Sequence, residues 1–486
     1  MDIQRKGFLK LAGVLATGSL LPGFARANLL KPKEEGPPPI GEETFSLSVC
    51  GLCPAGCGVR VRKVDGVAVG VSGSPDHPIN EGALCPKGAA GLQELYHPDR
   101  LKSPLLRAGD RGAGAWKEIS WEDALRRIGD ALGRERAGRG PLLAALGTAR
   151  GWDIESDLLG KLAASAGTDN YFTLGFPPNE PPGDAYRLMQ GSAALSCDLA
   201  EPRLLISFGW DWLAAHPSHV EAQRAFARLR RRGGERAHII QVEPRFSLSA
   251  AKADSWLPIR PGTQGLLALA AAREIISKGR QDSAFLRERS LAFAEFAKAL
   301  EPFSIPRVSK AAGIPERSIR LLCVKLTNTK PALAITGRGP LFDQLAVHAL
   351  NAVLGGLGEE GLFSSWREEA GHAGIQEAPG DPIEALLVDR VNPLFTAPAA
   401  WKPVFENTPL VVTVSPFLTE TAEYSDWVLP CGTPLERPHC SLHRMMDGRS
   451  ILNAAPRAVE PAADAKDPGE IFLLIAKTLG LQGFGA

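Results

Sequence analysis

Three cysteines, Cys50, Cys53 and Cys57, lie in one short segment, CGLCPAGCGVR, and a fourth follows at Cys85. Four thiolates with the spacing C-x2-C-x3-C-x27-C suit either a tetrahedral zinc ion or a 4Fe-4S cube. Zinc sites usually combine two short cysteine pairs, whereas here three ligands share one loop and the fourth comes from far along the chain. The spacing therefore favours the cube over zinc. A disulfide framework is least expected, because eight cysteines in 486 residues are too few for one.

The segment between Cys57 and Cys85 predicts how the fourth thiol reaches the other three. Apolar and polar residues alternate in VRVRKVDGVAVGV, and Asp65-Gly66 in its middle is typical of tight turns between antiparallel strands. A hairpin there would return the chain toward the first three cysteines. We therefore expect residues 44–104 to form one small iron-sulfur lobe.

Short apolar runs and helical segments alternate in the rest of the chain. PLLAALG, PRLLISFGW and HIIQVEP read as strands, and so do PALAITG, IEALLVDRVNP and PLVVTVSP further on. This alternation predicts parallel strands with crossover helices. We expect an α/β protein with two doubly wound, mainly parallel domains: one formed by residues 105–140 and 331–480, and one inserted as residues 141–330.

Residues 1–27 have the pattern of an export signal, with a basic start, a short apolar run and the small-residue end ARA. QRKGFLK is similar to the twin-arginine signal, with Lys6 where the second arginine would stand. The alternative is an amphipathic helix of the mature protein, which Gly13, Gly18 and Pro22 disfavour. Residues 28–43 are charged and proline-rich, which predicts a linker.

The charges of the chain nearly balance, with 55 basic and 54 acidic side chains, so no global field would attract nucleic acid or an anionic membrane. The basic run RLRRRGGER lies where a predicted helix ends before two glycines. Arginines complement the helix dipole there and glycines cap the helix. The run therefore predicts a solvated helix end rather than a nucleic-acid site.

Several motifs occur in an order that resembles the molybdopterin oxidoreductase family, to which DMSO reductase, formate dehydrogenase and nitrate reductase are related. These motifs are the cysteine pattern, CPKG, HPDRLKSPLLR, WKEISWEDAL, VEPRFSLSAAKADSWLPIRPGT and VSPFLTETAEYSDWVLP. The resemblance runs from about residue 44 to 480. It implies that Cys50, Cys53, Cys57 and Cys85 bind one 4Fe-4S cluster, and that Lys87 lies between this cluster and a pterin.

The resemblance weakens where the family binds molybdenum or tungsten. Family members usually add one protein ligand to the metal from a loop in the first α/β unit. The corresponding loop, YFTLGFPPNEPPGDAYRLMQGSA, has no cysteine or serine at the expected place. Glu180 and Asp184 could coordinate a metal, but their placement is more typical of loop and helix-cap residues.

The residues that would bind the guanine dinucleotides of the pterins also differ from the family. Gly209 and Asp211 stand where a Gly-x-Asn loop is expected, and Gln264 replaces an acid that reads guanine. An aspartate can accept from both guanine N–H groups, and an amide cannot do so with both of its atoms. The glycine-rich segment expected after Glu436 keeps only Gly448-Arg449 in register. We therefore expect the pterin dinucleotide to be bound weakly or not at all.

Other residues near these motifs have two interpretations, as part of a binding site or as ordinary packing. His439, Cys440, His443 and Cys431 could form a small metal site, but scattered surface residues are the commoner case. The sequence assigns no role to Cys197 or Cys323. If no pterin is bound, side chains of this chain would fill the crevice at the carboxyl ends of the two parallel sheets. The alternative is that the aromatic residues there are ordinary core or interface residues. The candidates to fill the crevice are Trp210, Trp212, Phe176, Pro177 and Pro178.

The chain ends at GEIFLLIAKTLGLQGFGA, where the family's C-terminal β-barrel-like domain would begin, so we expect that domain to be absent. The resemblance then favours the molybdenum-free homologues of alternative complex III and of quinone-reductase complexes. These are periplasmic or lie on the outer face of the cytoplasmic membrane. The expected function is an exported 4Fe-4S electron-transfer subunit of a respiratory oxidoreductase complex.

The expected partners are a ferredoxin-like iron-sulfur subunit, a quinone-binding membrane subunit and, as a further candidate, a cytochrome c. No membrane span is expected after the signal. Two alternatives stay open: a catalytic molybdenum or tungsten bis-pterin oxidoreductase with its lid domain on another chain, and a structural docking subunit without redox function.

Overall fold

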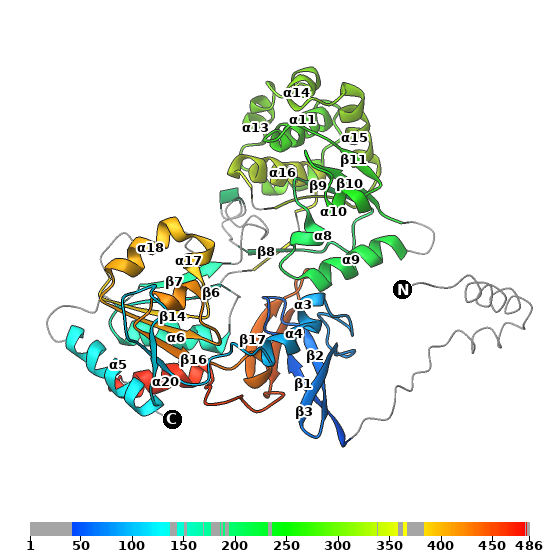
Figure 1. Cartoon of the computed structure of the whole chain (residues 1–486). Helices are drawn as coiled ribbons and strands as arrows, with labels where there is room; N and C mark the ends of the chain where they lie inside the picture. The colour runs from blue at the N-terminus through cyan, green and yellow to red at the C-terminus, as the bar shows by residue number, and fades with distance from the viewer. Residues whose placement is uncertain are drawn as a thin grey trace, which may run out of the picture.

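The computed structural model describes residues 41–136, 143–149, 153–168, 170–175, 185, 188–189, 194–231, 236–337, 339–357, 363–366, 383–481 and 483. The predicted export signal and nearly all of the predicted linker lie outside these ranges. Figure 1 shows three parts: a small lobe at lower right, a seven-stranded sheet at lower left and a four-stranded sheet at the top, each with its helices.

An antiparallel sheet in the order β1-β2-β3 builds the small lobe. Its strands are β1 (Glu43–Val49), β2 (Gly58–Val64) and β3 (Val67–Gly73). Asp65 and Gly66 join β2 to β3 with φ values of 49° and 80°, as a two-residue turn of this kind requires. The predicted hairpin is confirmed. Two short helices follow it, α3 (Pro86–Ala89) and α4 (Gly91–Leu95).

The largest sheet has the strand order β5-β4-β16-β15-β14-β6-β7. Its parallel strands are β6 (Leu143–Ala149), β7 (Tyr171–Gly175), β14 (Ala385–Asp389), β15 (Leu410–Ser415) and β16 (Trp427–Pro430). The antiparallel strands β4 (Leu105–Arg107) and β5 (Trp116–Glu118) extend one edge. The strands β14 and β15 are buried along their whole length, because helices cover both faces of the sheet.

Two layers of helices cover this sheet (Figure 1). One core cluster joins it to α5 (Trp121–Arg136), α6 (Ile154–Ser165) and α20 (Pro468–Thr478). Another lies against α17 (Pro393–Thr396) and α18 (Pro398–Asn407), where Trp401 and Phe405 are fully buried. The short helix α19 (Glu420–Glu423) precedes β16.

The second parallel sheet has the order β11-β10-β9-β12. Its strands are β9 (Leu204–Phe208), β10 (His238–Val242), β11 (Ser255–Leu257) and β12 (Ala332–Thr336). One face packs on α11 (Gln264–Ser277), α14 (Ile305–Ala312), α15 (Glu316–Asn328) and α16 (Leu341–Leu354). The other face packs on α8 (Trp212–Ala215) and α9 (His219–Arg231). The shorter helices are α10 (Leu248–Lys252), α12 (Ser283–Arg289) and α13 (Phe293–Ala299).

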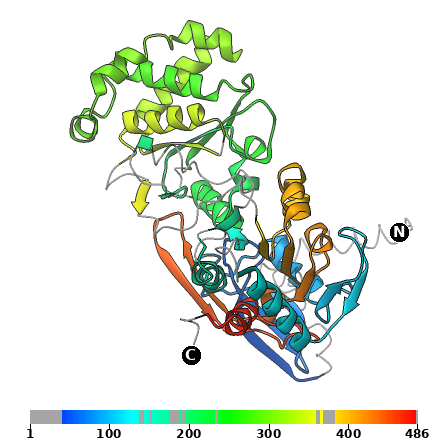
Figure 2. The same ribbon diagram turned by 90° about the vertical axis from the view of Figure 1, so that its left-hand side faces the viewer.

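Two antiparallel pairs complete the fold. They are β8 (Ala194–Cys197) with β13 (Phe363–Trp366), and β17 (His439–Arg444) with β18 (Ser450–Ala455). The 3-10 turn η1 (Pro434–Glu436) precedes β17. Figure 2 shows the helices of the second sheet as the part farthest from α20. In the described ranges, no helix is both long and apolar enough to cross a membrane.

The expected α/β class, with its small lobe and mainly parallel sheets, is confirmed, but strand pairing groups some segments differently from the sequence. β6 and β7, expected in the inserted domain, lie in the larger sheet, where β6 pairs with β14 and β7 pairs with β6. β12, expected outside that domain, pairs with β9. A buried apolar run reveals a strand but not the sheet that it joins, because every such run looks alike.

Each parallel sheet has one point at which the winding direction reverses. In the larger sheet this switch point lies between β6 and β14, since the chain winds outward from β6 to β7 and from β14 to β16. In the smaller sheet it lies between β9 and β12. Open α/β sheets bind ligands beyond the carboxyl ends of the strands at such points. We call these two places the first and the second crevice.

Candidate iron-sulfur site and cofactor crevices

The loop of the first three cysteines joins β1 to β2. The backbone N–H of Cys50 donates to the carbonyl oxygen of Cys57 at 2.8 Å, which closes the loop at its base. Gly56 has a φ of 60°, and a Cβ at this position would lie 2.6 Å from the amide nitrogen of Asn453. That nitrogen donates to the carbonyl oxygen of Gly56 at 3.1 Å. A side chain from β18 therefore fixes the loop.

Asn80 brings the fourth cysteine to the loop. It is fully buried and accepts from Gly58 N at 3.0 Å, while its amide nitrogen donates to the carbonyl oxygens of Gly58 and Ala83 at 2.9 and 2.7 Å. These bonds fold the segment after β3 back onto the start of β2. Cys85 then stands at the N-cap position of α3 and packs against the same apolar cluster as the loop.

The four thiols share one apolar environment. Cys50 and Cys57 are buried, Cys53 and Cys85 are partly buried, and all four lie in one hydrophobic cluster. Burial raises the pKa of Cys50 to about 11. Burial, and then the neighbouring cysteines, raise the pKa of Cys57 to about 12. Four thiolates could not coexist here without positive charge between them, so the donor set fits a cationic iron-sulfur group.

A site for a single metal ion is the alternative to a cluster. Within the described part of the chain, no three His, Cys, Asp or Glu side chains converge as they would around one metal ion. The candidates for a small metal site contact different partners. His439 contacts the carbonyl oxygen of Pro434 at 2.6 Å, and His443 contacts Glu221 at 3.0 Å. Cys431 is buried beside Arg390.

Lys87 lies on α3, exposed, two residues after Cys85. Burial dominates the pKa of two groups near it, raising that of Cys50 and lowering that of His219 at the start of α9; the positive charge of Lys87 opposes the first shift and adds to the second. Lys87 therefore lies near both the cysteines and the start of α9. Its place between a cluster and a pterin stays a prediction.

Helix α9 and strand β17 cover the cysteines from the other side. Val220 of α9 and Met445 after β17 belong to the cysteine cluster. The neighbouring Glu221, 6% exposed, is held by His443 and by the backbone N–H of Met446 at 3.1 Å. Burial would raise the pKa of Glu221, but the hydrogen bond from His443 holds it below its usual value.

Trp210 fills the second crevice. It follows β9, is 5% exposed, and its carbonyl oxygen accepts from Ser207 Oγ at 2.8 Å and Gln241 Nε2 at 2.9 Å. Gly337 follows β12, and a Cβ there would lie 2.7 Å from the indole ring of Trp210. The ring thus closes the gap between the ends of β9 and β12. Trp212 is fully buried in the core instead, near Phe226.

The loop around Trp210 offers little to an anion. Phosphates at such a loop are bound by free backbone N–H groups. Here Gly209 N already donates to the carbonyl oxygen of Val242 at 2.8 Å. Asp211 adds a carboxylate, which accepts from the backbone N–H and the hydroxyl of Ser249 at 3.0 and 2.7 Å. Gln264 lies against Gly209, and its Oε1 is buried without a hydrogen-bond partner among the described residues.

Four charged side chains fill the first crevice. Asp389, the fully buried last residue of β14, accepts from Arg390 at 2.7 and 2.6 Å. Arg390 also pairs with Glu155 at the start of α6, at 3.0 Å, and Glu155 accepts from Arg437 at 2.6 Å. Burial would lower the pKa of Arg390, but the two carboxylates hold it well above its usual value. Because two cations and two anions cancel, these four side chains leave no net positive charge for a phosphate.

The described residues of both crevices therefore do not fit a pterin dinucleotide. The loop expected to carry a metal ligand is described only in part. Glu180, Asp184, Phe176, Pro177 and Pro178 all lie outside the described residues.

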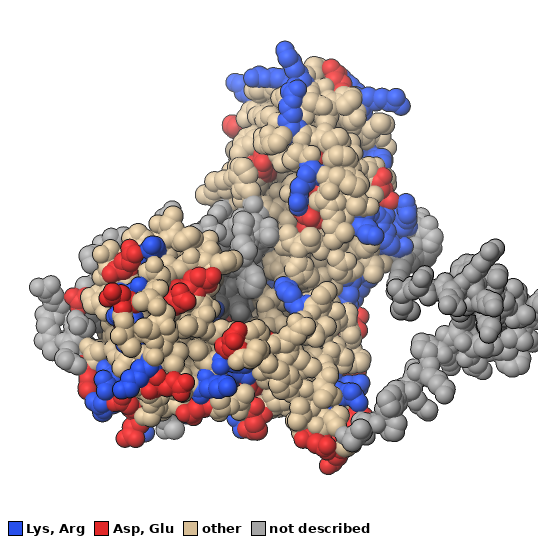
Figure 3. Space-filling model, viewed as in Figure 1, with Lys and Arg blue, Asp and Glu red and all other residues tan. Residues whose placement is uncertain are grey.

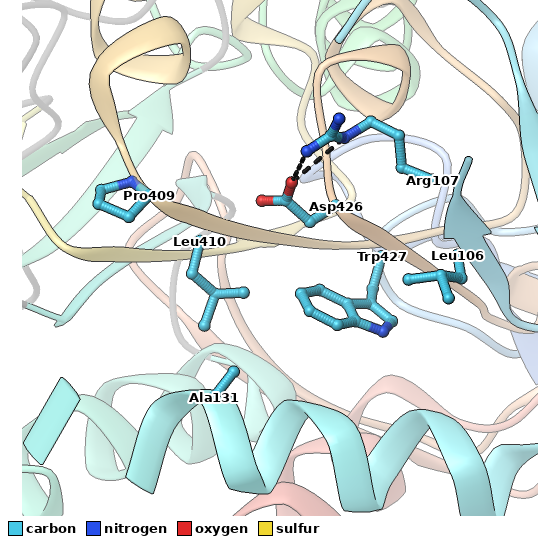
Figure 4. Close-up of a pocket in the computed structure, with 7 residues that line it drawn as sticks. All are labelled: Leu106, Arg107, Ala131, Pro409, Leu410, Asp426 and Trp427. Carbon is cyan, nitrogen blue, oxygen red and sulfur yellow. Dashed lines mark hydrogen bonds and ion pairs between the residues drawn. The ribbon is translucent and has the colours of Figure 1, made fainter. Parts of the chain in front are cut away.

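A pocket of about 300 Å³ opens at the opposite, amino-terminal edge of the larger sheet (Figure 4). Leu410 and Trp427, the first residues of β15 and β16, line it together with Arg107 and Asp426. Asp426 is already paired with Arg107 and Arg111 and accepts from Val411 N at 2.7 Å. The charges of this pocket are thus satisfied internally, and it is remote from both crevices.

Sequence reasoning missed the residues that hold the site together. Asn80 and Asn453 hold the cysteine loop, Glu221 joins α9 to β17 and to the turn after it, and Glu155 with its arginines fills the first crevice. Their contacts join segments far apart in the chain, 397 residues for Asn453 with Gly56 and 282 for Arg437 with Glu155. No local pattern reveals such pairs.

A cysteine lobe joined to two doubly wound parallel sheets defines a class of iron-sulfur α/β proteins, and comparison with known families identifies which one. The family described as molybdopterin oxidoreductase Fe4S4 domain matches residues 43–97, and the one described as molybdopterin oxidoreductase matches residues 100–356. The chain belongs to the molybdopterin oxidoreductase family, and its small lobe is a 4Fe-4S domain. The assignment of the four cysteines as the ligands stays a prediction.

Relatives and one solved structure extend this similarity. The molybdopterin-binding-like subunit of the menaquinone reductase of Nitratidesulfovibrio vulgaris is 30% identical, and the match covers 99% of this chain and 73% of that protein. The molybdopterin-containing subunit of Salmonella typhimurium thiosulfate reductase is 25% identical, with 99% and 70% covered. Acetylene hydratase from Pelobacter acetylenicus has the same fold, with a TM-score of 0.74 at 22% identity over 90% of this chain and 70% of that one.

Proposed function

We propose that this chain is the 4Fe-4S electron-transfer subunit of a respiratory oxidoreductase complex, and that its molybdenum site is no longer used. The observation that carries the proposal is the contrast between two sites in one molecule. Four cysteines share one apolar cluster near Lys87, whereas the described residues of both crevices are filled by the chain's own side chains.

The residues of the lobe support one-electron transfer. A bound 4Fe-4S cluster supplies one-electron oxidation and reduction. Around it, Val59, Val61 and Ile79 exclude water, and Asn80 and Asn453 fix the backbone that carries the cysteines. A rigid, dry shell of this kind limits rearrangement when the charge of the cluster changes.

The respiratory role rests on the relatives. A subunit of a menaquinone reductase and one of a thiosulfate reductase match nearly the whole chain. By this similarity, the partners proposed are a ferredoxin-like iron-sulfur subunit and a quinone-binding membrane subunit, with a cytochrome c as a further candidate. The signal-like N-terminus supports export, by the twin-arginine route, to the periplasm or to the outer face of the membrane.

Metal and pterin analysis of anaerobically purified protein from metal-replete cells tests this proposal. We expect about four irons and four sulfides per chain, reducible in a redox titration, with neither pterin nor molybdenum or tungsten. Near-stoichiometric pterin with either metal would instead establish the catalytic alternative. Iron that cannot be reduced without unfolding would establish the structural one.

A further inference from the structure

The outer face of the small sheet exposes large apolar side chains. Phe45 and Leu47 of β1 are 49% and 63% exposed, and Val67 of β3 is 54% exposed. Monomeric soluble proteins seldom leave such residues grouped in the open, and a group of them marks a contact surface. Figure 1 shows β1 to β3 at the margin of the molecule.

Strand register places these residues on one face. Phe45 lies opposite Arg62, and Leu47 opposite Arg60, so the four side chains project to the same side of the sheet. Val67 lies opposite Val64, which continues this face onto β3. We call Phe45, Leu47, Arg60, Arg62 and Val67 the outer sheet face.

The inner face of the same sheet packs on the cysteines. Val59, Val61 and Ala68 point inward and belong to the cysteine cluster. Only the thickness of one sheet therefore separates the outer sheet face from the cluster site. A partner bound there would come close to the cluster without disturbing its shell.

The charges of this face indicate the chemistry of the partner. Arg62 is paired with Glu43 at 2.8 Å. Arg60 is exposed, and its guanidinium lies 4.5 Å above the ring of Phe45, which holds it over the apolar face. Among the described residues, no carboxylate forms an ion pair with Arg60. A guanidinium held in this way can bind a carboxylate with two parallel hydrogen bonds.

The second α/β part offers a control for this surface. Figure 3 shows Lys and Arg gathered at the top of the second α/β part, while both signs of charge mix over the lower parts. The exposed Leu321 of α15, 52% exposed, lies on that upper part, far along the chain from the cysteines. It therefore offers a matched control residue.

We propose that the outer sheet face is the docking surface for a partner subunit that presents an apolar patch with carboxylates beside it. The inference rests on the proposed electron-transfer function and adds the place at which the partner binds. Aromatic residues and arginine are enriched at the centres of protein interfaces, as Phe45 and Arg60 are here. The carboxylate would meet Arg60, while Leu47 and Val67 would be covered by apolar side chains.

Photo-crosslinking in the native host tests the occupant of this face. A photoreactive amino acid at Leu47 of the full chain should give a covalent adduct with a second polypeptide, mapped to a segment with Asp or Glu. The same amino acid at Leu321 should not give this adduct. An adduct with residues 1–40 of the same chain, an adduct with a second copy, or no adduct at Leu47 would each overturn the proposal.

Substitutions test the contribution of each residue to docking. When this chain is purified by a tag from membrane extracts, the subunit identified by crosslinking should copurify with it. Leu47→Asp and Arg60→Glu should each lower the yield of that subunit at least tenfold, while Leu321→Asp should leave it unchanged. Iron content and melting temperature should stay as in the wild type, which excludes misfolding as the cause. Unchanged yield with both variants would refute the docking surface.

The two proposals can fail separately. If the cluster is reducible and pterin is absent but the yield does not change, only the docking surface is wrong. If pterin and molybdenum are found, the function proposed above is wrong whatever the yield shows.

Discussion

Replacing Arg100 with methionine breaks the buried ion pair that ties the iron-sulfur lobe to the turn before β17. Nη1 and Nη2 of Arg100 meet the two carboxylate oxygens of Glu436 at 2.8 and 2.7 Å, and the two side chains are 6% and 0% exposed. Methionine keeps most of the volume, so the main effect is a buried carboxylate without its cation. Breaking a buried pair in this way costs about 3–5 kcal/mol.

The other hydrogen bonds of Glu436 determine how much free energy is lost within this range. Its carboxylate still accepts from the backbone N–H and hydroxyl of Thr433, at 2.7 and 2.8 Å, and from Ala462 N at 2.6 Å. These three donors offset part of the lost attraction. We therefore expect a loss near the lower end, about 3 kcal/mol.

Hydrogen exchange is the suitable assay, because a protein of several parts need not unfold in one step. Amides of β1 to β3 should exchange through a local opening that becomes about 150-fold more populated in Arg100→Met. Adding Glu436→Gln should recover much of the loss, since it removes the unpaired charge. The matched control is Arg457→Met, which breaks an exposed pair with Glu460 at 2.7 Å and should change little. Equal losses in the two single variants, or no recovery in the double variant, would refute the reasoning.

Four further outcomes are expected. Cys85→Ser should remove the cluster, seen as loss of iron and of the brown colour, whereas Cys323→Ser should keep both. Lys87→Ala should lower the reduction potential by about 70 mV, since a charge at about 10 Å contributes roughly 1.7 kcal/mol at an effective dielectric near 20; an unchanged titration would show that Lys87 does not face the cluster. Trp210→Ala should destabilise the second α/β part by about 3–5 kcal/mol in its hydrogen exchange, and a loss below about 1 kcal/mol would contradict a filled crevice. Burial raises the pKa of Asp467 to about 6, so its share of the unfolding free energy is present below its usual pKa near 4 and is lost as the pH rises through about 6; Asp467→Asn should remove this fall between pH 4 and 6, which urea unfolding would measure.

Sequence reasoning succeeded where neighbouring residues decide the structure. The alternation around Asp65-Gly66 specifies a hairpin through turn geometry alone, and the apolar runs specify parallel strands through burial on both faces. It could not place β6 and β12 in their sheets, because their apolar runs fit either partner.

The candidate site shows the same limit. Local spacing was enough to single out the cysteines, because three of them lie on one loop. The filling of the first crevice could not be foreseen, since Glu155, Arg390 and Arg437 come from three distant segments and each alone reads as an ordinary surface residue. Trp210 was a candidate only because a motif pointed to the loop that carries it.

The shell of the cysteines has a consequence for how the protein is made. The thiols are all synthesised by residue 85, but Val220, Leu435, Met445 and Ala458 cover them, and Asn453 holds their loop. If only the first lobe had been synthesised, a cluster bound to it would be exposed to water on the side that these later residues cover. Insertion of the cluster is therefore expected after translation of almost the whole polypeptide, so that the order of biogenesis is set by the path of the chain.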